Sequence, residues 1–206
     1  MSESRGERKE RTRRAILDAA LALCEDSSLV AVSLRQVAKE VGIVPTAFYR
    51  HFDSLEDLGL ELVDESFVSL RMMLRDVRRN DPAFADIVDR SVDTLVSHVH
   101  QRRAHFAFIA RERSAGPVVV RERIRDEIEL CERELAVDLA RLTGPAPWSE
   151  HDLQVLANLM VTAMVATAEA VLLSAGRPDM EKYVTERART QLRMALIGAL
   201  QWRSRP

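Results

Sequence analysis

The chain has 206 residues, of which 47% are hydrophobic and 30% are charged, and its formal net charge at pH 7 is −2. This composition is that of a soluble globular protein with a sizeable core, and it excludes a uniformly basic nucleic-acid coat. The N-terminus is charged where a signal peptide would be apolar. The two cysteines, Cys24 and Cys131, form no C-x-x-C pair, so we expect both to pack in the core of a cytoplasmic protein.

Positive charge is concentrated near the start of the chain. Residues 1–52 hold nine basic and seven acidic residues, a net charge of +2, which leaves −4 for the remainder. A mildly basic head on an acidic body fits a modular DNA-binding protein, although charge runs are commonly just solvated surface. The first fourteen residues set six basic side chains against three acidic ones: Arg5, Arg8, Lys9, Arg11, Arg13 and Arg14 against Glu3, Glu7 and Glu10.

The elements expected in chain order are all helices, because apolar residues recur at helical spacing and breakers are few. No strand pattern stands out, so the fold class is all-α, with about nine helices. Ser33 is expected to cap the second helix, Gly42 to end it, and Pro45 to open the third. The predicted helices cover about 8–25, 34–41, 45–52, 55–79, 84–100, 103–113, 118–142, 149–175 and 180–202.

The most informative segment is Val32–Phe52, which has the pattern of a helix-turn-helix. Such a motif needs a small residue where the two helices touch, a glycine in the turn and apolar residues that fix the angle. Ala38, Gly42 and Phe48 supply these at suitable spacing. The segment therefore predicts a DNA-binding head.

The third helix also predicts a surface that reads DNA. Phe48 and Phe52 lie four apart on its inner face, which leaves polar residues outside. Thr46 and Tyr49 could donate hydrogen bonds to phosphates, Ala47 could touch a thymine methyl, and Arg50 could bond a guanine edge. A plain solvated surface is the alternative for any one of these residues.

These residues, taken together, resemble the DNA-binding domain of the tetracycline-repressor (TetR) family. The resemblance covers about residues 9–69. It is carried by Arg11-Thr12-Arg13-Arg14, Ile16-Leu17-Asp18-Ala19-Ala20, Ser33-Leu34-Arg35, Val37-Ala38, Gly42 and Phe48-Tyr49-Arg50-His51-Phe52.

The resemblance implies a TetR-type DNA-binding domain at 9–69, with its helix-turn-helix at 32–51, and a helical effector-binding and dimerisation domain at 70–206. It implies a homodimeric repressor that binds double-stranded palindromic operator DNA. Many members begin helix 4 with a lysine that grips a phosphate, and Leu55 stands there instead. The DNA-binding residues carried over are Ser33, Arg35, Pro45, Thr46, Ala47, Tyr49, Arg50 and His51.

Further along, the chain is similar to the family's repressors of unsaturated fatty acid synthesis. Leu58-Gly59-Leu60, Val63-Asp64-Glu65-Ser66, Leu70-Arg71 and Arg111-Glu112-Arg113-Ser114 carry this similarity. It implies a hydrophobic effector such as an acyl-CoA. Plain core packing and an internal Arg–carboxylate network are the alternatives for these stretches. The predicted pocket comprises Leu70, Met73, Leu74, Phe106, Phe108, Ile109, Arg111, Met160 and Met164.

The last two predicted helices are apolar on more than one face, so each must bury a second face. A four-helix bundle across a two-fold axis would do so, and a thick monomeric core is the alternative. The predicted dimer interface comprises Met160, Met164, Leu192, Leu196 and Leu200. The apolar stretch 153–168 is interrupted by polar residues, so we expect a buried helix and no membrane partner.

Other functions remain as alternatives. The five histidines assemble no site, and no catalytic or nucleotide-binding motif occurs, so neither an enzyme nor a metal or cofactor is expected. A regulator of an efflux or catabolic operon with an unrelated hydrophobic effector is the main alternative. An activator and, more distantly, a helical enzyme acting on acyl thioesters are the others.

Overall fold

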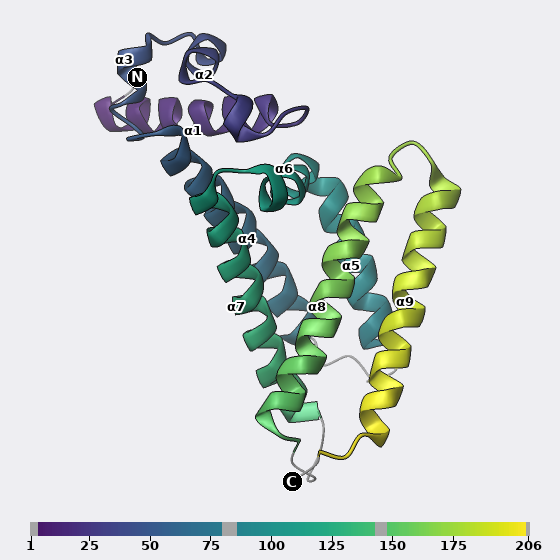
Figure 1. The fold of residues 1–206 in the computed structure, drawn as a ribbon. Helices are drawn as coiled ribbons and strands as arrows, with labels where there is room; N and C mark the ends of the chain where they lie inside the picture. The colour runs from purple at the N-terminus through teal and green to yellow at the C-terminus, as the bar shows by residue number, and fades with distance from the viewer. Residues whose placement is uncertain (1–3, 80–85, 143–147, 205–206) are drawn as a thin grey trace. The chain divides into compact units, whose positions relative to one another are not determined.

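The computed structural model describes residues 4–79, 86–142 and 148–204. Within these ranges the chain forms nine α-helices and one short 3-10 helix, with no strand (Figure 1). The all-α prediction is therefore confirmed. The helices are α1 (Arg5–Leu23), η1 (Leu29–Ala31), α2 (Leu34–Val41), α3 (Pro45–Phe48), α4 (Leu55–Arg79), α5 (Ile87–Gln101), α6 (Arg103–Ala115), α7 (Val118–Leu142), α8 (Glu150–Leu173) and α9 (Pro178–Gln201).

The helix boundaries follow the stop and start signals of the sequence. Ser33 caps α2, with its hydroxyl accepting from the Gln36 N–H and the Gln36 side chain accepting from the Ser33 N–H. Gly42 ends α2 at φ +76°, a left-handed conformation that favours glycine. Pro45 occupies the first turn of α3, where its missing N–H leaves no bond unmade. The 3-10 helix η1 was not expected from the sequence.

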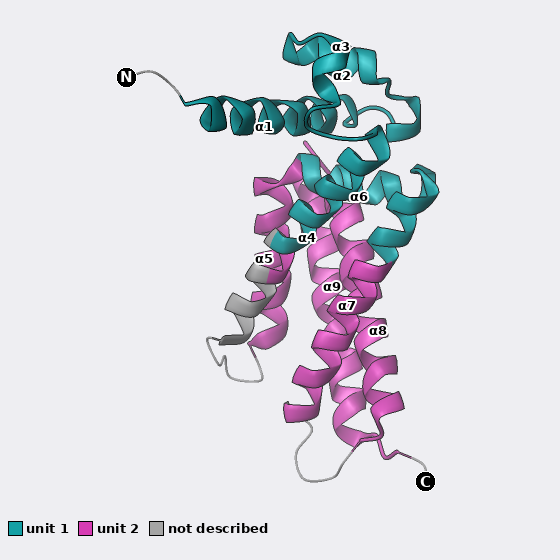
Figure 2. Cartoon of the chain, turned by 90° about the vertical axis from the view of Figure 1, so that its left-hand side faces the viewer, with its two compact units in different colours: residues 1–68, 104–125 teal, residues 69–103, 126–206 magenta. Residues whose placement is uncertain are grey.

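The chain divides into two compact units (Figure 2). Unit 1 comprises residues 1–68 and 104–125, and unit 2 comprises residues 69–103 and 126–206. This division differs from the predicted boundary between 9–69 and 70–206, because α6 and the first part of α7 group with the N-terminal helices. The sequence order of the helices could not show this.

Unit 1 is held by an apolar core beneath the helix-turn-helix. In Figure 1, α1 runs across below α2 and α3. The rings of Phe48 and Phe52 lie 5.8 Å apart between centroids, and both side chains are almost fully buried. Cys24 is also fully buried, which raises the pKa of its thiol to about 12 and leaves it unreactive at neutral pH. The other buried apolar residues of the first three helices include Ile16, Leu17, Ala20, Val37 and Ala38.

Two adjacent residues of α6 bond the segment that follows α1. The guanidinium of Arg111 donates to the backbone carbonyls of Cys24 and Ser27. The fully buried carboxylate of Glu112 accepts from the Leu29 N–H at 3.0 Å and from the Ser28 hydroxyl at 3.1 Å. These bonds join α6 to the α1–α2 connection, and they explain why α6 belongs to unit 1.

Replacing Glu112 tests this link. Glu112→Ala is expected to destabilise the protein by about 1–3 kcal/mol, because the buried Leu29 N–H loses its acceptor. Glu112→Gln keeps an acceptor for that N–H and is the matched control. Urea unfolding of the two variants and the wild type measures the difference, and equal stability of Glu112→Ala and wild type would show that the contact carries no energy.

The difference in stability between Glu112→Gln and the wild type is also expected to depend on pH. Burial raises the pKa of Glu112, so the folded state holds this proton to higher pH than the unfolded state does. Stability from the protonated carboxyl is therefore present below the ordinary carboxyl pKa of 4.5 and is lost as the pH rises through the folded-state value. The stability of Glu112→Gln relative to wild type is expected to increase over that interval. A difference independent of pH would contradict the assignment.

Unit 2 is built on α5, α8 and α9, with α8 and α9 packed along each other (Figure 1). One apolar cluster buries Val88 and Val92 of α5 against Ala188, Leu192 and Leu196 of α9. Met160, Ala163 and Met164 of α8 pack against the same cluster. On the flank, the guanidinium of Arg193 bonds both oxygens of Asp89 at 2.7 Å. This face of α9 is therefore buried against α5 and α8 of the same chain.

Candidate nucleic-acid interface

The third helix of the head is short and is held from one side. After Phe48 the chain continues in tight turns, with the Arg50 N–H donating to Ala47 and the His51 N–H to Phe48. Phe48 is fully buried, and its ring meets that of Tyr49 edge-on at 5.9 Å. We call α3 and the turns that follow it, residues 45–52, the α3 segment. Packing of its inner face, which includes Phe48, holds its outer face in place.

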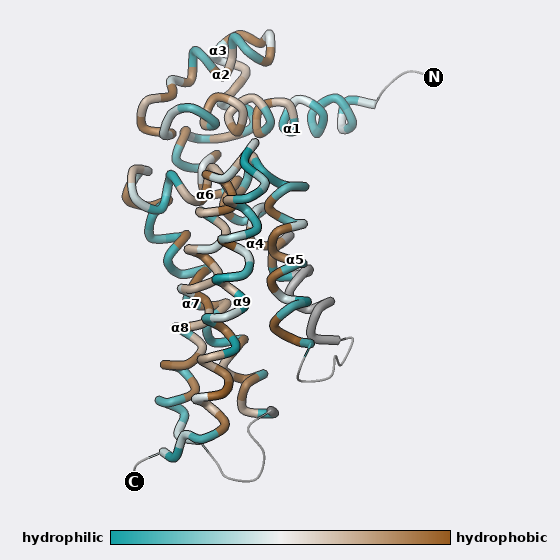
Figure 3. Tube along the Cα trace, turned by 90° about the vertical axis from the view of Figure 1, so that its right-hand side faces the viewer, coloured by the Kyte–Doolittle hydropathy of each residue, from teal (hydrophilic) through white to brown (hydrophobic). Residues whose placement is uncertain are grey.

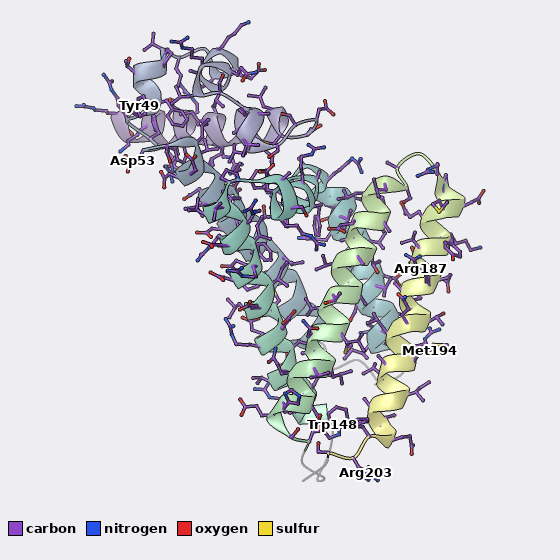
Figure 4. The ribbon with its side chains drawn as sticks, viewed as in Figure 1. Tyr49, Asp53, Trp148, Arg187, Met194 and Arg203 are labelled. Atoms are coloured by element: carbon purple, nitrogen blue, oxygen red, sulfur yellow. The ribbon has the colours of Figure 1, made fainter. Side chains whose placement is uncertain are left out.

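The outer face carries the residues that the sequence singled out. Tyr49 is 60% exposed. A large aromatic side chain in this position contributes little to the stability of the fold, because little of its apolar surface is buried. Tyr49 directly follows α3, at the position labelled in Figure 4. Exposed hydroxyl, methyl and guanidinium groups on one short segment can together bond phosphates and base edges. The other exposed residues among those predicted to bind DNA are Ser33, Arg35, Pro45, Thr46 and Arg50, whereas Ala47 is half-buried.

His51 differs from its neighbours. Its side chain is partly buried, and its Nδ1 lies among the buried side-chain atoms without a hydrogen-bond partner in the described residues. Burial, together with the positive charges of Lys9, Arg13 and Arg50, lowers the pKa of the imidazole. His51 is therefore neutral at pH 7, and any bond it makes to a phosphate would be that of a neutral N–H donor.

Arg13 of α1 braces the end of this segment, and the sequence did not mark it for that role. Its guanidinium donates to the His51 carbonyl at 2.8 Å and lies 4.3 Å from the centre of the Phe52 ring. A third contact, 3.1 Å long, joins it to the carboxylate of Glu61 in α4. Arg13 thereby links α1 to α4 and to the turn that follows α3. Only its place in a basic run was visible in the sequence.

The residues predicted to line an effector pocket are divided between the units. In unit 1, Phe108 is buried, Phe106 and Ile109 are half-buried, and Arg111 bonds backbone carbonyls. This is a correction for Arg111, because a guanidinium engaged with the Cys24 and Ser27 carbonyls has a structural role. Among the residues that the structure describes, Arg111 forms no ion pair with a carboxylate, so that alternative is not observed either. In unit 2, Leu70, Met160 and Met164 are half-buried, and the side chains of Met73 and Leu74 lie outside the described residues.

An internal ion-pair network does form around the neighbouring residues. Within unit 1, Asp64 pairs with Arg123 at 2.7 Å and Glu65 pairs with Arg14 at 2.5 Å. Within unit 2, Arg71 bonds Glu127. The acidic and basic residues of 64–71 thus have partners inside the protein, but these pairs are not the expected ones of Arg71 or Arg111 with Asp64 or Glu65.

Two other kinds of site are a metal centre and a membrane-spanning helix. Over the described ranges, no group of three or more His, Cys, Asp or Glu side chains could hold a metal ion. One described helix, α8, is long and apolar enough to cross a membrane, and 28% of its most apolar window is buried in the protein. By itself this is weak evidence for a span, since helices that bury two faces in soluble proteins have the same composition.

The comparison with known proteins agrees with the geometry of the head. The family profile described as bacterial regulatory proteins, tetR family, matches residues 16–62, the stretch from α1 into α4. These helices contain the helix-turn-helix and its apolar scaffold.

Solved structures similar to this chain extend over nearly its whole length. A TetR-like transcriptional regulator from Rhodococcus sp. RHA1 is 16% identical over 91% of this chain and 96% of that one, with a TM-score of 0.67. FadR from Bacillus subtilis, solved in complex with stearoyl-CoA, is 12% identical over 90% and 98%, also with a TM-score of 0.67. A gamma-butyrolactone receptor, an ArpA-like protein, is 18% identical over 91% and 98%, with a TM-score of 0.57.

Residues 16–62 therefore form a helix-turn-helix DNA-binding head of the kind found in bacterial regulatory proteins of the tetR family. The described remainder of the chain is helical, and the chain as a whole shares the fold of the solved regulators named above.

Proposed function

We propose that this regulator represses transcription as a homodimer that reads a palindromic operator with the α3 segment of each protomer. The observation that carries the proposal is the pairing of an outward Tyr49 and Arg50 with a fully buried Phe48 behind them. Arg50 is proposed to bond a guanine edge, and Ala47 to contact a thymine methyl. Backbone phosphates are proposed to be bound by Ser33, Arg35, Thr46, Tyr49 and His51, with Pro45 at the rim.

The proposed dimer surface is an apolar stripe on α8 and α9. On α9, Met194, Ile197 and Leu200 are 68%, 64% and 56% exposed. On α8, Val155 and Leu159 are 53% and 55% exposed, and they are followed on the same face by the small residues Thr162 and Ala166, also exposed. Such a stripe fits a four-helix bundle formed with α8 and α9 of a second copy.

This surface corrects the interface predicted from the sequence. Leu192 and Leu196 are 3% and 7% exposed within their own protomer, because they pack against α5. Met160 and Met164 pack against the same cluster. Of the predicted interface residues, Leu200 stays on the proposed dimer face. Figure 4 marks Met194, the most exposed of the α9 residues proposed for that face, on α9.

We also propose that the effector is a hydrophobic molecule, with a long-chain acyl-CoA as the first candidate and lipid metabolism genes as the targets. The likeness to FadR with its bound stearoyl-CoA supports the choice of ligand to test first. Within unit 2, Met160 and Met164 are half-buried, flexible apolar side chains that could adapt to an acyl chain. Arg111 is no longer proposed to hold a headgroup. The likeness to a gamma-butyrolactone receptor favours, as the second candidate, a smaller apolar effector and a different operon.

Gel shifts on genomic fragments that the wild-type protein selects test the effector. Stearoyl-CoA is expected to weaken operator binding by roughly 5–150-fold, the usual range for allosteric coupling, and to raise the melting temperature of the free protein. Coenzyme A alone and a gamma-butyrolactone are the comparison ligands. Unchanged affinity and unchanged melting temperature with stearoyl-CoA would refute the acyl-CoA proposal, and an effect of the lactone alone would favour the second candidate.

A further inference from the structure

The first turns of α1 form a basic helical extension of the DNA-binding head. A capping box begins the helix, with the Ser4 hydroxyl accepting from the Glu7 N–H and the Glu7 carboxylate accepting from the Ser4 N–H. Residues from Arg5 onward are therefore held in a regular helix. These turns are hydrophilic and extend away from α2 and α3 (Figure 3).

One face of this extension leads directly to the α3 segment. Arg5, Lys9 and Arg13 are spaced four residues apart, so they follow one another along the same side of the helix. Arg13 contacts the His51 carbonyl and the Phe52 ring. Lys9 precedes it by one turn and Arg5 by two, and both are exposed.

The charge of Lys9 also acts on His51. Burial lowers the pKa of the His51 imidazole most, and the positive charges of Lys9, Arg13 and Arg50 lower this pKa further. Glu10 acts on His51 in the opposite direction, with the smallest contribution. The positive potential around His51 therefore has one source just after α3, Arg50, and two in α1, Lys9 and Arg13.

We propose that Lys9 and Arg5 bind backbone phosphates of the operator beside the bases that α3 reads. A row of two exposed cations that continues from Arg13 along α1 suits a polyanion with regularly spaced charges. Phosphate contacts of this kind position a protein on the duplex without reading sequence. The proposal rests on operator binding by α3.

The salt dependence of operator affinity tests this directly. Each phosphate neutralised contributes about 0.9 to the slope of log K against log salt concentration, so Arg5→Gln with Lys9→Gln is expected to lower the slope by roughly 1.8 per subunit bound. Affinity is expected to fall about equally for all operator sequences. The melting temperature is expected to stay unchanged, because both side chains are exposed.

Arg11→Gln alone, compared with Lys9→Gln alone, is the matched control, since each removes one positive charge from α1. A helix turns by about 100° per residue, so Arg11 lies on nearly the opposite side from Lys9. A much smaller change of slope is expected for the control. An unchanged slope in the Arg5/Lys9 variant, or an equal loss in the control, would overturn the proposal while leaving α3 as the reader. Failure of the wild type to select any DNA would overturn both.

Discussion

Ile197→Glu together with Leu200→Glu is expected to convert the protein from a dimer to a monomer and to abolish tight operator binding. Both side chains are more than half exposed in the single protomer, so the substitution leaves the internal packing of α9 intact. In the proposed dimer each copy would instead bury two unpaired carboxylates. An uncompensated buried charge costs about 3–5 kcal/mol. Two such charges per protomer together cost more than the free energy of association of most dimers.

Sedimentation at micromolar concentration and operator titration measure this result. Operator affinity is expected to fall by more than roughly 100-fold, because two half-sites are no longer bound by one linked particle. Val137→Glu on α7 is the matched control, since Val137 is 56% exposed but lies on another helix. A double variant that remains dimeric would show that the α8–α9 stripe is not the interface.

The second large effect concerns the reading surface itself. Arg50→Ala is expected to weaken operator binding by about 1–3 kcal/mol, roughly 5–150-fold, as the loss of a bidentate bond to guanine would. Tyr49→Phe, which removes one hydroxyl, is expected to cost about 0.5–1.5 kcal/mol on every sequence. Both residues are exposed, so melting temperatures should not change.

Fluorescence anisotropy with labelled operator measures these changes. Arg121→Ala is the matched control, because Arg121 is an exposed arginine of unit 1 on α7, outside the proposed DNA-binding surface. If Tyr49→Phe and Arg50→Ala bind as tightly as this control, the α3 segment is not the recognition element.

The local structure of the head was predictable because each signal acts over a few residues. Ser33, Gly42 and Pro45 determine where α2 and α3 begin and end through capping, positive φ and a missing N–H. Phe48 and Phe52 predicted the buried side of the motif from their spacing alone. The remaining residues of this motif helix were then expected to face solvent.

The contacts between distant segments could not be predicted in the same way. Arg13 meets the carbonyl of His51, and Arg111 meets those of Cys24 and Ser27. Every residue has a backbone carbonyl, so the sequence does not indicate which carbonyl an arginine will bond. From the sequence, Arg13 was expected only to belong to a basic run, and Arg111 to pair with a headgroup or a carboxylate. The grouping of α6 with the head depends on the same bonds.

The proposed dimer face could be predicted only in part, for a different reason. Periodicity indicates that α9 has apolar residues on two sides, but not which side faces its own protomer. The assignment depends on α5, whose Val88 and Val92 cover Leu192 and Leu196. Once that side is buried, the exposed Met194 and Ile197 mark the other.

Operator reading by the α3 segment is tested most directly by selecting bound sequences from a randomised DNA library with the wild type and with Arg50→Ala. The wild type is expected to enrich an inverted repeat, with half-sites in successive major grooves, and Arg50→Ala to retain the repeat while losing its preference at one base pair in each half. Recovery of unrelated sequences by the wild type, or identical preferences in the two proteins, would contradict operator reading by the α3 segment.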